Sequence, residues 1–266
     1  MNIPYSKSLL SVFAILSLLA TTAAAAPRHI DCNAGKTISD ALEAAAGSAK
    51  LLELTVSGEC NEDVTIRRNV NIDGLSDTII NGTIRIFNGH AHISNLHVSG
   101  QNHGVIVSSG PLLIASNVWL AGNQGHGLVI RRNATVIYRG GAIEGNAMSG
   151  VFLEDGYLLM RDGTWVASNQ GDGVQLDLGS KAILQDSFVV FNEAVGVSAT
   201  LHSLVDMRGS TYVADNAFFG AVAVQDSAIR ISNAAVNVYG FIHCGDDESS
   251  LETGGAGPID TDCSGF

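Results

Sequence analysis

The feature that most constrains this chain is a pattern that repeats every 23 or 24 residues between Gly100 and Gly240. Each repeat opens with Asn and has Gly four residues later. The Asn positions are Asn123, Asn146, Asn169, Asn192 and Asn216, and the Gly positions are Gly127, Gly150, Gly173, Gly196 and Gly220. A fixed period of this length is typical of a solenoid, in which each repeat contacts only its neighbours.

Each repeat predicts three short strands and three tight corners. In the coil 123–145, the segments 128–131, 134–138 and 142–144 alternate as strands do, and Arg132-Asn133 and Gly140-Gly141 form turns. A leucine-rich repeat is the alternative solenoid, since Val118-x-Leu120-x-x-Asn123 fits its strand signature, but the leucine-bearing arm that should follow is missing. The pattern therefore predicts an all-β, right-handed parallel β-helix of seven or eight coils, in which the Asn residues form a hydrogen-bonded ladder.

The N-terminal segment 1–25 has the composition of a secretory signal. Lys7 is the positive residue, Leu9 to Leu19 is an apolar core too short to span a membrane, and Ala23-Ala24-Ala25 is a small-residue cleavage site. An uncleaved anchor is the alternative. We expect a periplasmic or secreted protein without a membrane span in the mature chain.

The net charge of −12 argues against nucleic acid as a partner, because binding to phosphates requires clustered Lys and Arg. The same charge would repel an anionic polymer unless a cation intervened.

The two ends of the chain depart from the repeat. The segment Thr37 to Gly47 predicts a short helix, with Thr37 and Asp40 placed as in a capping box. The sequence thus divides into a signal (1–25), an N-terminal cap with this helix (26–53), a parallel β-helix (54–240) and a C-terminal cap (241–266).

Four cysteines in an exported chain suggest two disulfides, with three connectivities open. Their positions favour Cys32–Cys60 and Cys244–Cys263, because each pair would close one end of the solenoid, where the sheet edges need protection.

The first coils also carry a family resemblance. Thr37-Ile-x-x-Ala41-Leu, Val56-Ser-Gly-Glu-Cys-Asn-Glu-x-Val-x-Ile66 and a strand ending in Ile-Asp-Gly74 resemble exported right-handed β-helix repeat proteins of the pectin-lyase-like superfamily. The resemblance covers nearly all of the mature chain and implies the fold. That superfamily includes polysaccharide lyases, hydrolases, esterases and epimerases as well as members without assigned activity.

The catalytic patterns of that superfamily are incomplete here. Gly125-His126-Gly127 and Asp246-Asp247 occur in the wrong order for a polygalacturonase, and its other motifs are missing. Weaker candidates are Arg131, Glu154 and Asp177, which alternation places outward on one line of the first strand. In an enzyme, Arg131 would act as a base or charge stabiliser, and the two carboxylates would hold a cation or serve as an acid/base pair. The alternative is an exposed charge ladder in which Arg131 pairs with Glu154.

Two groups of residues are candidate metal sites, and each has a purely structural alternative. His103 and His126 should stack one coil apart and share a metal, or be solvated corner residues. Asp246 and Asp247 could bind a cation or lie in a solvated turn. We expect no cofactor, with calcium needed only if the protein is a lyase.

The third strand carries an aromatic column. Trp119, Trp165, Phe188 and Tyr212 recur at one position, and Ala142 interrupts them. The steadily aliphatic column one residue later is Leu120, Ile143, Val166, Val189 and Val213, which places the aromatics outward. The opposite orientation, with the rings in the core, is the alternative.

The function predicted is an exported module that contacts a glycan or cell-envelope component through this column, without a walled active site. No coil between Asn123 and Asn216 departs from 23 residues by more than one, so long loops that would enclose a substrate are missing there. A lyase or hydrolase acting on acidic polysaccharide is the alternative function.

Overall fold

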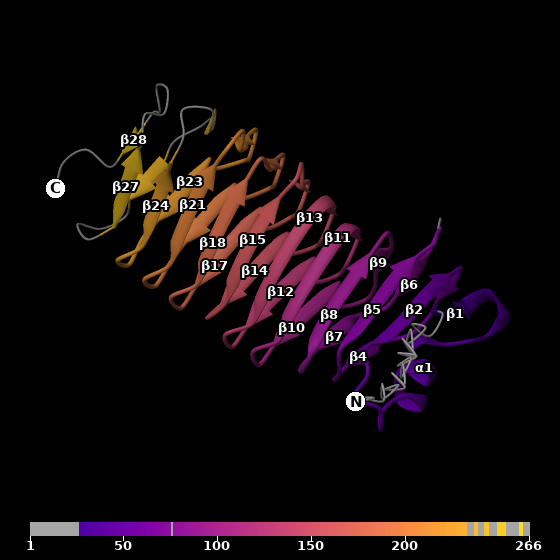
Figure 1. Ribbon diagram of the computed structural model, residues 1–266. Coiled ribbons are helices and arrows are strands. Elements are labelled where there is room, and N and C mark those ends of the chain that lie inside the picture. Colours follow the sequence, from indigo (N-terminus) through magenta and orange to yellow (C-terminus); the bar gives the residue numbers. More distant parts are fainter. Residues whose placement is uncertain are drawn as a thin grey trace, which may run out of the picture.

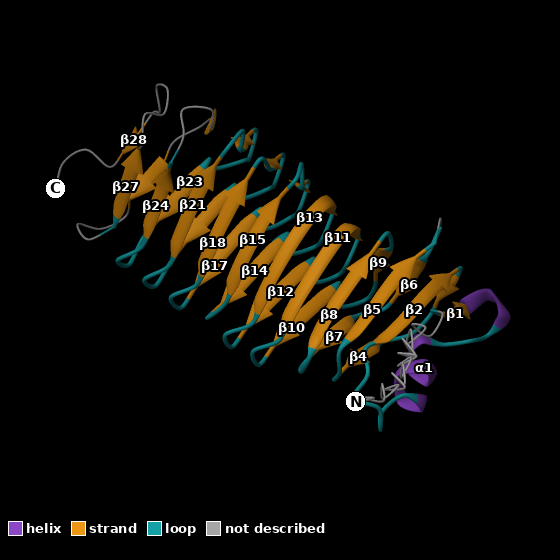
Figure 2. Ribbon diagram, viewed as in Figure 1, coloured by secondary structure: helices purple, strands orange, loops and turns teal. Residues whose placement is uncertain are grey.

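The computed structural model describes residues 27–75, 77–232, 237–238, 242–244, 249–253 and 261–262. Within these ranges the chain forms a parallel solenoid of about nine coils, one or two more than the repeat predicts. The coils stack from the end that carries α1 (Ile38–Ala44) to the end at β28 (Thr261–Asp262) (Figure 1). Figure 2 shows helix at the N-terminal end and strands throughout the stack.

Each coil contributes a strand to a first sheet. All ten strands of this sheet pair in parallel with the strands of the neighbouring coils. They are β4 (Val64–Ile66), β7 (Ile84–Ile86), β10 (Val105–Ser108), β12 (Leu128–Arg131), β14 (Val151–Glu154), β17 (Val174–Asp177), β20 (Val197–Ala199), β23 (Ala221–Ala223), β26 (Ile242–Cys244) and β28 (Thr261–Asp262).

The second and third sheets are joined, because two long strands run through the corner between them. These are β11 (Leu112–Ala121) and β13 (Thr135–Glu144). The other strands of the second sheet are β1 (Arg28–Asp31), β2 (Leu52–Ser57), β5 (Val70–Gly74), β8 (His90–Ser94), β15 (Tyr157–Arg161), β18 (Lys181–Gln185), β21 (Leu204–Arg208), β24 (Ala228–Ile231) and β27 (Ser250–Thr253). Those of the third sheet are β3 (Glu59–Cys60), β6 (Ile79–Asn81), β9 (His97–Ser99), β16 (Trp165–Ala167), β19 (Phe188–Val190), β22 (Tyr212–Ala214) and β25 (Asn237–Val238).

The inward columns form one continuous core. The predicted inward residues are at most 1% exposed. They are Val105, Leu128, Val151, Val174 and Val197 in the first sheet, and Leu120, Ile143, Val166, Val189 and Val213 in the third. This confirms the alternation that places the aromatic column on the outside.

The Asn ladder is present, and it is buried from Asn123 to Asn192. Asn146 donates from Nδ2 to Oδ1 of Asn169 at 2.8 Å, and its own Oδ1 accepts from Nδ2 of Asn123 at 2.8 Å. The same bond links Asn169 to Asn192 and Asn192 to Asn216, both at 2.9 Å. Asn146, Asn169 and Asn192 are fully or almost fully buried, and the ladder engages both the oxygen and the nitrogen of each of their side chains.

The Gly column exists because of that ladder. A Cβ atom on Gly150 would lie 2.7 Å from Nδ2 of Asn169 and 2.6 Å from Cγ1 of Val166. Gly173 and Gly196 would meet the amides of Asn192 and Asn216 at 2.7 and 2.6 Å. The two columns keep one register because each Asn amide occupies the space that a side chain at the Gly position would need.

The N-terminal cap closes the first coils. Thr37 caps α1 by accepting a hydrogen bond from the Asp40 amide at 3.0 Å, and Glu62 accepts from the Ile38 and Ser39 amides at 2.7 and 3.0 Å. The predicted Cys32–Cys60 disulfide is confirmed, with 5.0 Å between the Cα atoms. Strand β1 already pairs with β2, so sheet pairing begins inside the segment that the sequence assigned to the cap. A short 3-10 turn, η1 (Cys32–Ala34), follows β1.

Several predictions fall outside the described residues. They are the signal segment 1–25, the acids Asp246 and Asp247, and the Cys244–Cys263 disulfide, since Cys263 is not described. In the described part of the chain, no helix is long and apolar enough to cross a membrane.

Candidate functional site

The aromatic column lies on the outer face of the third sheet. Trp119 is in register with Ala142, Ala142 with Trp165, Trp165 with Phe188, and Phe188 with Tyr212. Trp165 is 44% exposed, and Trp119, Phe188 and Tyr212 are half-buried. The column therefore presents four aromatic side chains along the axis of the solenoid.

The rings stack on one another. Trp165 and Phe188 lie with ring centroids 4.6 Å apart and planes 17° from parallel, and Tyr212 tilts against Phe188 at 6.4 Å. Spacings of this size are those of favourable aromatic pairs, and here they follow from the strand spacing of about 4.8 Å. Stacked rings cover each other's faces, so the pairs offer mainly their edges to a ligand.

The column extends one coil further toward the N-terminus than the sequence indicated. His97 is in register with Trp119 and stacks on it, with ring centroids 5.0 Å apart. The sequence gives the signal for this in His97-Val98-Ser99, where a buried valine follows an outward residue as Leu120 follows Trp119. The Asn-Gly pattern does not reach this coil, so the repeat alone does not assign His97 to the column.

A small apolar strip runs beside the aromatics. Ala167, Val190 and Ala214 lie two residues after the rings, are at most 8% exposed and pack together with Tyr212. One coil before Ala167 the same position is Glu144, which is exposed. The strip therefore packs against Tyr212 and makes this flank of the column apolar from Ala167 to Ala214.

The outer face of the first sheet holds the predicted charged line. Arg131 and Glu154 form an ion pair, with 3.0 Å between Nε and Oε2, and the guanidinium lies 5.4 Å from the centre of the Phe152 ring. Asp177 accepts hydrogen bonds from the Thr200 hydroxyl at 3.1 Å and from the Leu178 amide at 2.8 Å. The three residues are neighbours as predicted, but their charged groups are engaged with each other and with adjacent rungs.

Val129, on the same face, is less exposed than strand alternation predicts. Val129 has outward parity but is fully buried, because Ile106 and Phe152 flank it in the same column. This part of the face is therefore a covered apolar surface and not an open cleft.

The predicted stacking of His103 on His126 is present, and Phe152 extends it to a stack of three rings. His126 lies between His103 and Phe152, with centroid distances of 5.3 and 5.0 Å. Burial, followed by the nearby His103, lowers the pKa of His126 to about 4, and burial also lowers the pKa of His103. The Nδ1 atom of His103 accepts a hydrogen bond from the His126 amide at 3.0 Å, which engages one of the two ring nitrogens that would bind a metal.

The carboxylate of Asp172, two coils beyond His126, is a further potential metal ligand, and both of its oxygens already accept hydrogen bonds. It accepts from the Val195 amide at 3.0 Å and from the Ser198 hydroxyl at 2.6 Å. Among the described residues, the one group of three potential ligand atoms within 4.8 Å of one another is Cys32, Cys60 and Glu62. Its sulfurs are bonded to each other, so this group is part of the cap and not a metal site.

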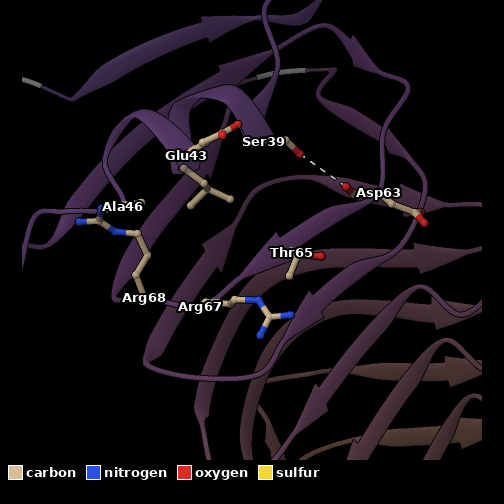
Figure 3. A pocket seen from close by; sticks show the side chains of 8 residues that line it. Ser39, Glu43, Ala46, Asp63, Thr65, Arg67 and Arg68 are labelled. Carbon is tan, nitrogen blue, oxygen red and sulfur yellow. Dashed lines mark hydrogen bonds between the residues drawn. The ribbon is translucent and has the colours of Figure 1, made fainter.

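A hollow of about 410 Å³ lies between α1 and β4 and is lined by Ser39, Glu43, Asp63, Thr65, Arg67 and Arg68 among others (Figure 3). Its charges hold the cap in place. Arg68 donates to the carbonyls of Ala45 and Lys50, and Asp63 pairs with Arg85 at 2.9 Å, which lowers the pKa of Asp63. We therefore interpret this hollow as a packing feature of the cap.

Comparison with known proteins identifies the family. Residues 82–236 match the model of the right-handed β-helix region, and the chain belongs to this family. A search of curated protein sequences gives no significant match.

Two solved structures are similar over most of their length. The A-module of the mannuronan C-5 epimerase AlgE4 of Azotobacter vinelandii is 16% identical, with a TM-score of 0.39, and 90% of this chain and 93% of that chain are covered. A pectin methylesterase in complex with a hexasaccharide is 12% identical, with a TM-score of 0.31 and the same coverage. At this level of similarity neither enzyme's activity transfers to the chain.

Proposed function

We propose that this protein is an exported carbohydrate-binding β-helix that contacts a glycan or cell-envelope polysaccharide through the aromatic column of the third sheet. The single observation that carries the proposal is the outward-facing row formed by Trp119, Trp165, Phe188 and Tyr212, in which Trp165 is exposed and the others are half-buried. Exposed aromatic rows are costly to leave in water and mark binding surfaces. A row that follows the solenoid axis is suited to an extended polymer.

The proposal assigns no reaction to the protein. The charges on the first sheet's outer face are engaged within the sheet, and the buried Val129 leaves little room between them. A lyase or hydrolase acting on acidic polysaccharide, with Arg131 as its charged group and calcium as its cation, is the function that a turnover assay must exclude.

The test is a glycan array together with a turnover screen on pectin, polygalacturonate and alginate, with and without calcium. Tryptophan fluorescence is a selective readout, because the chain has two tryptophans and both lie in the column. We expect binding to an oligosaccharide to change the fluorescence, without turnover. Turnover of a polyuronide that is lost in Arg131→Ala would overturn the proposal in favour of the enzyme.

Export rests on the signal segment alone. Expression of the full chain in a bacterial host should give a protein in the periplasm or medium whose N-terminus lies near residue 26. Recovery of the intact chain in the cytoplasm would contradict this part of the proposal.

A further inference from the structure

The corner between β5 and β6, where the second sheet meets the third, lies at the N-terminal end of the aromatic column, and its residues line a hollow together with His97 and Trp119. Between β5 and β6 the chain takes four residues, 75–78, against at most three at the same corner from β8 to β22. The sequence-based expectation of a surface without walls covered the coils from Asn123 onward, and this corner lies before them. It forms one side of a hollow of about 310 Å³.

The wall of this hollow is held at both ends. The Leu75 amide donates to the Val56 carbonyl at 2.8 Å, and the buried Thr78 hydroxyl donates to the same carbonyl at 2.7 Å. A Cβ atom on Gly74 would lie 2.2 Å from the Asn95 carbonyl oxygen, so this last residue of β5 packs directly on the next coil. Leu75 and Thr78 are therefore both fixed to the preceding coil, which lowers the entropic cost of binding at these two residues.

The lining combines rings with planar polar groups. Its residues are Leu75, Asp77, Thr78, Ile79, Asn95, His97, Asn117 and Trp119. The stacked His97 and Trp119 give it an aromatic side, and Leu75, 44% exposed, adds an apolar side chain to the lining.

The polar side chains of the lining differ in whether they already have hydrogen-bond partners. Asn117 donates to Oδ1 of Asn95 at 3.0 Å, and Asn95 donates to Asp73 at 2.8 Å, which fixes both amides. Within the part of the chain that the structure describes, no hydrogen bond or ion pair engages the Asp77 carboxylate, and Asp77 is exposed. The hollow thus has fixed polar groups and one carboxylate available to accept from hydroxyl groups.

We infer that this hollow is a binding subsite for a single neutral pyranose unit of the glycan, an inference that rests on the proposed function. The volume lies at the small end of ligand pockets, as expected for one sugar ring. A pyranose has apolar C–H surfaces for Trp119 and Leu75 and hydroxyl groups for Asp77 and Asn117. None of the lining residues is Lys or Arg, and Asp77 disfavours the carboxylate of a uronic acid.

The test uses small glycosides that fit one subsite. Methyl glycosides of glucose, mannose, galactose and galacturonic acid are titrated into the full-length protein and into Asp77→Asn. Fluorescence of a Trp165→Phe protein, in which Trp119 is the one tryptophan, reports on the hollow. Asp155→Asn is the matched control, because Asp155 is also an exposed corner residue with positive φ and loses the same charge.

We expect one neutral glycoside to bind and the galacturonoside to bind at least tenfold more weakly. Asp77→Asn should lower the affinity for the neutral glycoside about fivefold to tenfold, because a charged acceptor is replaced by a neutral one of the same shape. The ratio of the affinities for the neutral glycoside and the galacturonoside should fall as well. Asp155→Asn should change neither affinity.

Two results would overturn the inference, and they are distinguishable. If oligosaccharides bind and Trp165→Ala weakens them, while Asp77→Asn and Leu75→Ala have no effect, the column binds glycan and the hollow is not a subsite. If no glycan on the array binds at all, the proposed function fails as well.

Discussion

The substitution Asn146→Ala tests the ladder on which the coil register depends. The Asn146 side chain is fully buried and makes four hydrogen bonds. Nδ2 donates to Oδ1 of Asn169 at 2.8 Å and to the Leu120 carbonyl at 3.1 Å, and Oδ1 accepts from Nδ2 and the amide of Asn123 at 2.8 and 3.1 Å.

At about 1 kcal/mol for each bond, with partners left unsatisfied in the core, the free energy of unfolding should fall by about 3–5 kcal/mol. Equilibrium unfolding in urea measures it. The control is Asn102→Ala, an exposed residue at the same corner two coils earlier but outside the ladder, which should change the stability by less than about 0.5 kcal/mol. A loss below about 1.5 kcal/mol for Asn146→Ala would refute the reasoning, because the ladder would then add little beyond the apolar columns.

Three further predictions concern other parts of the fold. Gly150→Ala should lower the free energy of unfolding by about 1–3 kcal/mol in the same urea assay, because its Cβ would overlap Val166 and Asn169; wild-type stability would contradict this. Arg131→Ala should cost at most about 1 kcal/mol in thermal or urea unfolding, because the ion pair is solvent-exposed; a larger loss would show that this residue supports the core. His126→Phe should keep the ring stack but flatten the pH dependence of stability. The folded-state pKa of about 4 lies below the unfolded value of about 6.5, so the unfolded wild-type chain takes up the proton first and stability falls as the pH drops from about 6.5 to about 4. Equal slopes for the two proteins in that window would contradict the assignment.

The sequence predicts the coil geometry well because its repeat is a direct record of contacts between neighbouring rungs. Gly150 and Asn169 occur in fixed register because one leaves the space that the other fills. Inward and outward positions follow from strand alternation, so the exposure of Trp165 could be inferred from the burial of Val166.

Features set by side-chain rotamers and by irregular coils could not be predicted in the same way. The stacking of Trp165 on Phe188, and hence the exposure of ring edges rather than faces, depends on rotamers that periodicity does not specify. The hollow beside Trp119 arises at a corner whose length departs from the repeat, in a coil without the Asn-Gly signal. Val129 is covered by its neighbours although its parity is outward.

The most direct test of the central claim is the affinity of Trp165→Ala for the oligosaccharide that the wild-type protein binds best, measured by isothermal titration calorimetry. Trp165 is more exposed than Trp119, Phe188 and Tyr212, so its removal should leave the fold intact, and circular dichroism checks this. We predict that the affinity falls at least tenfold, in line with the loss of a central aromatic contact. An unchanged affinity in the folded variant would contradict the claim that the aromatic column is the carbohydrate-binding surface.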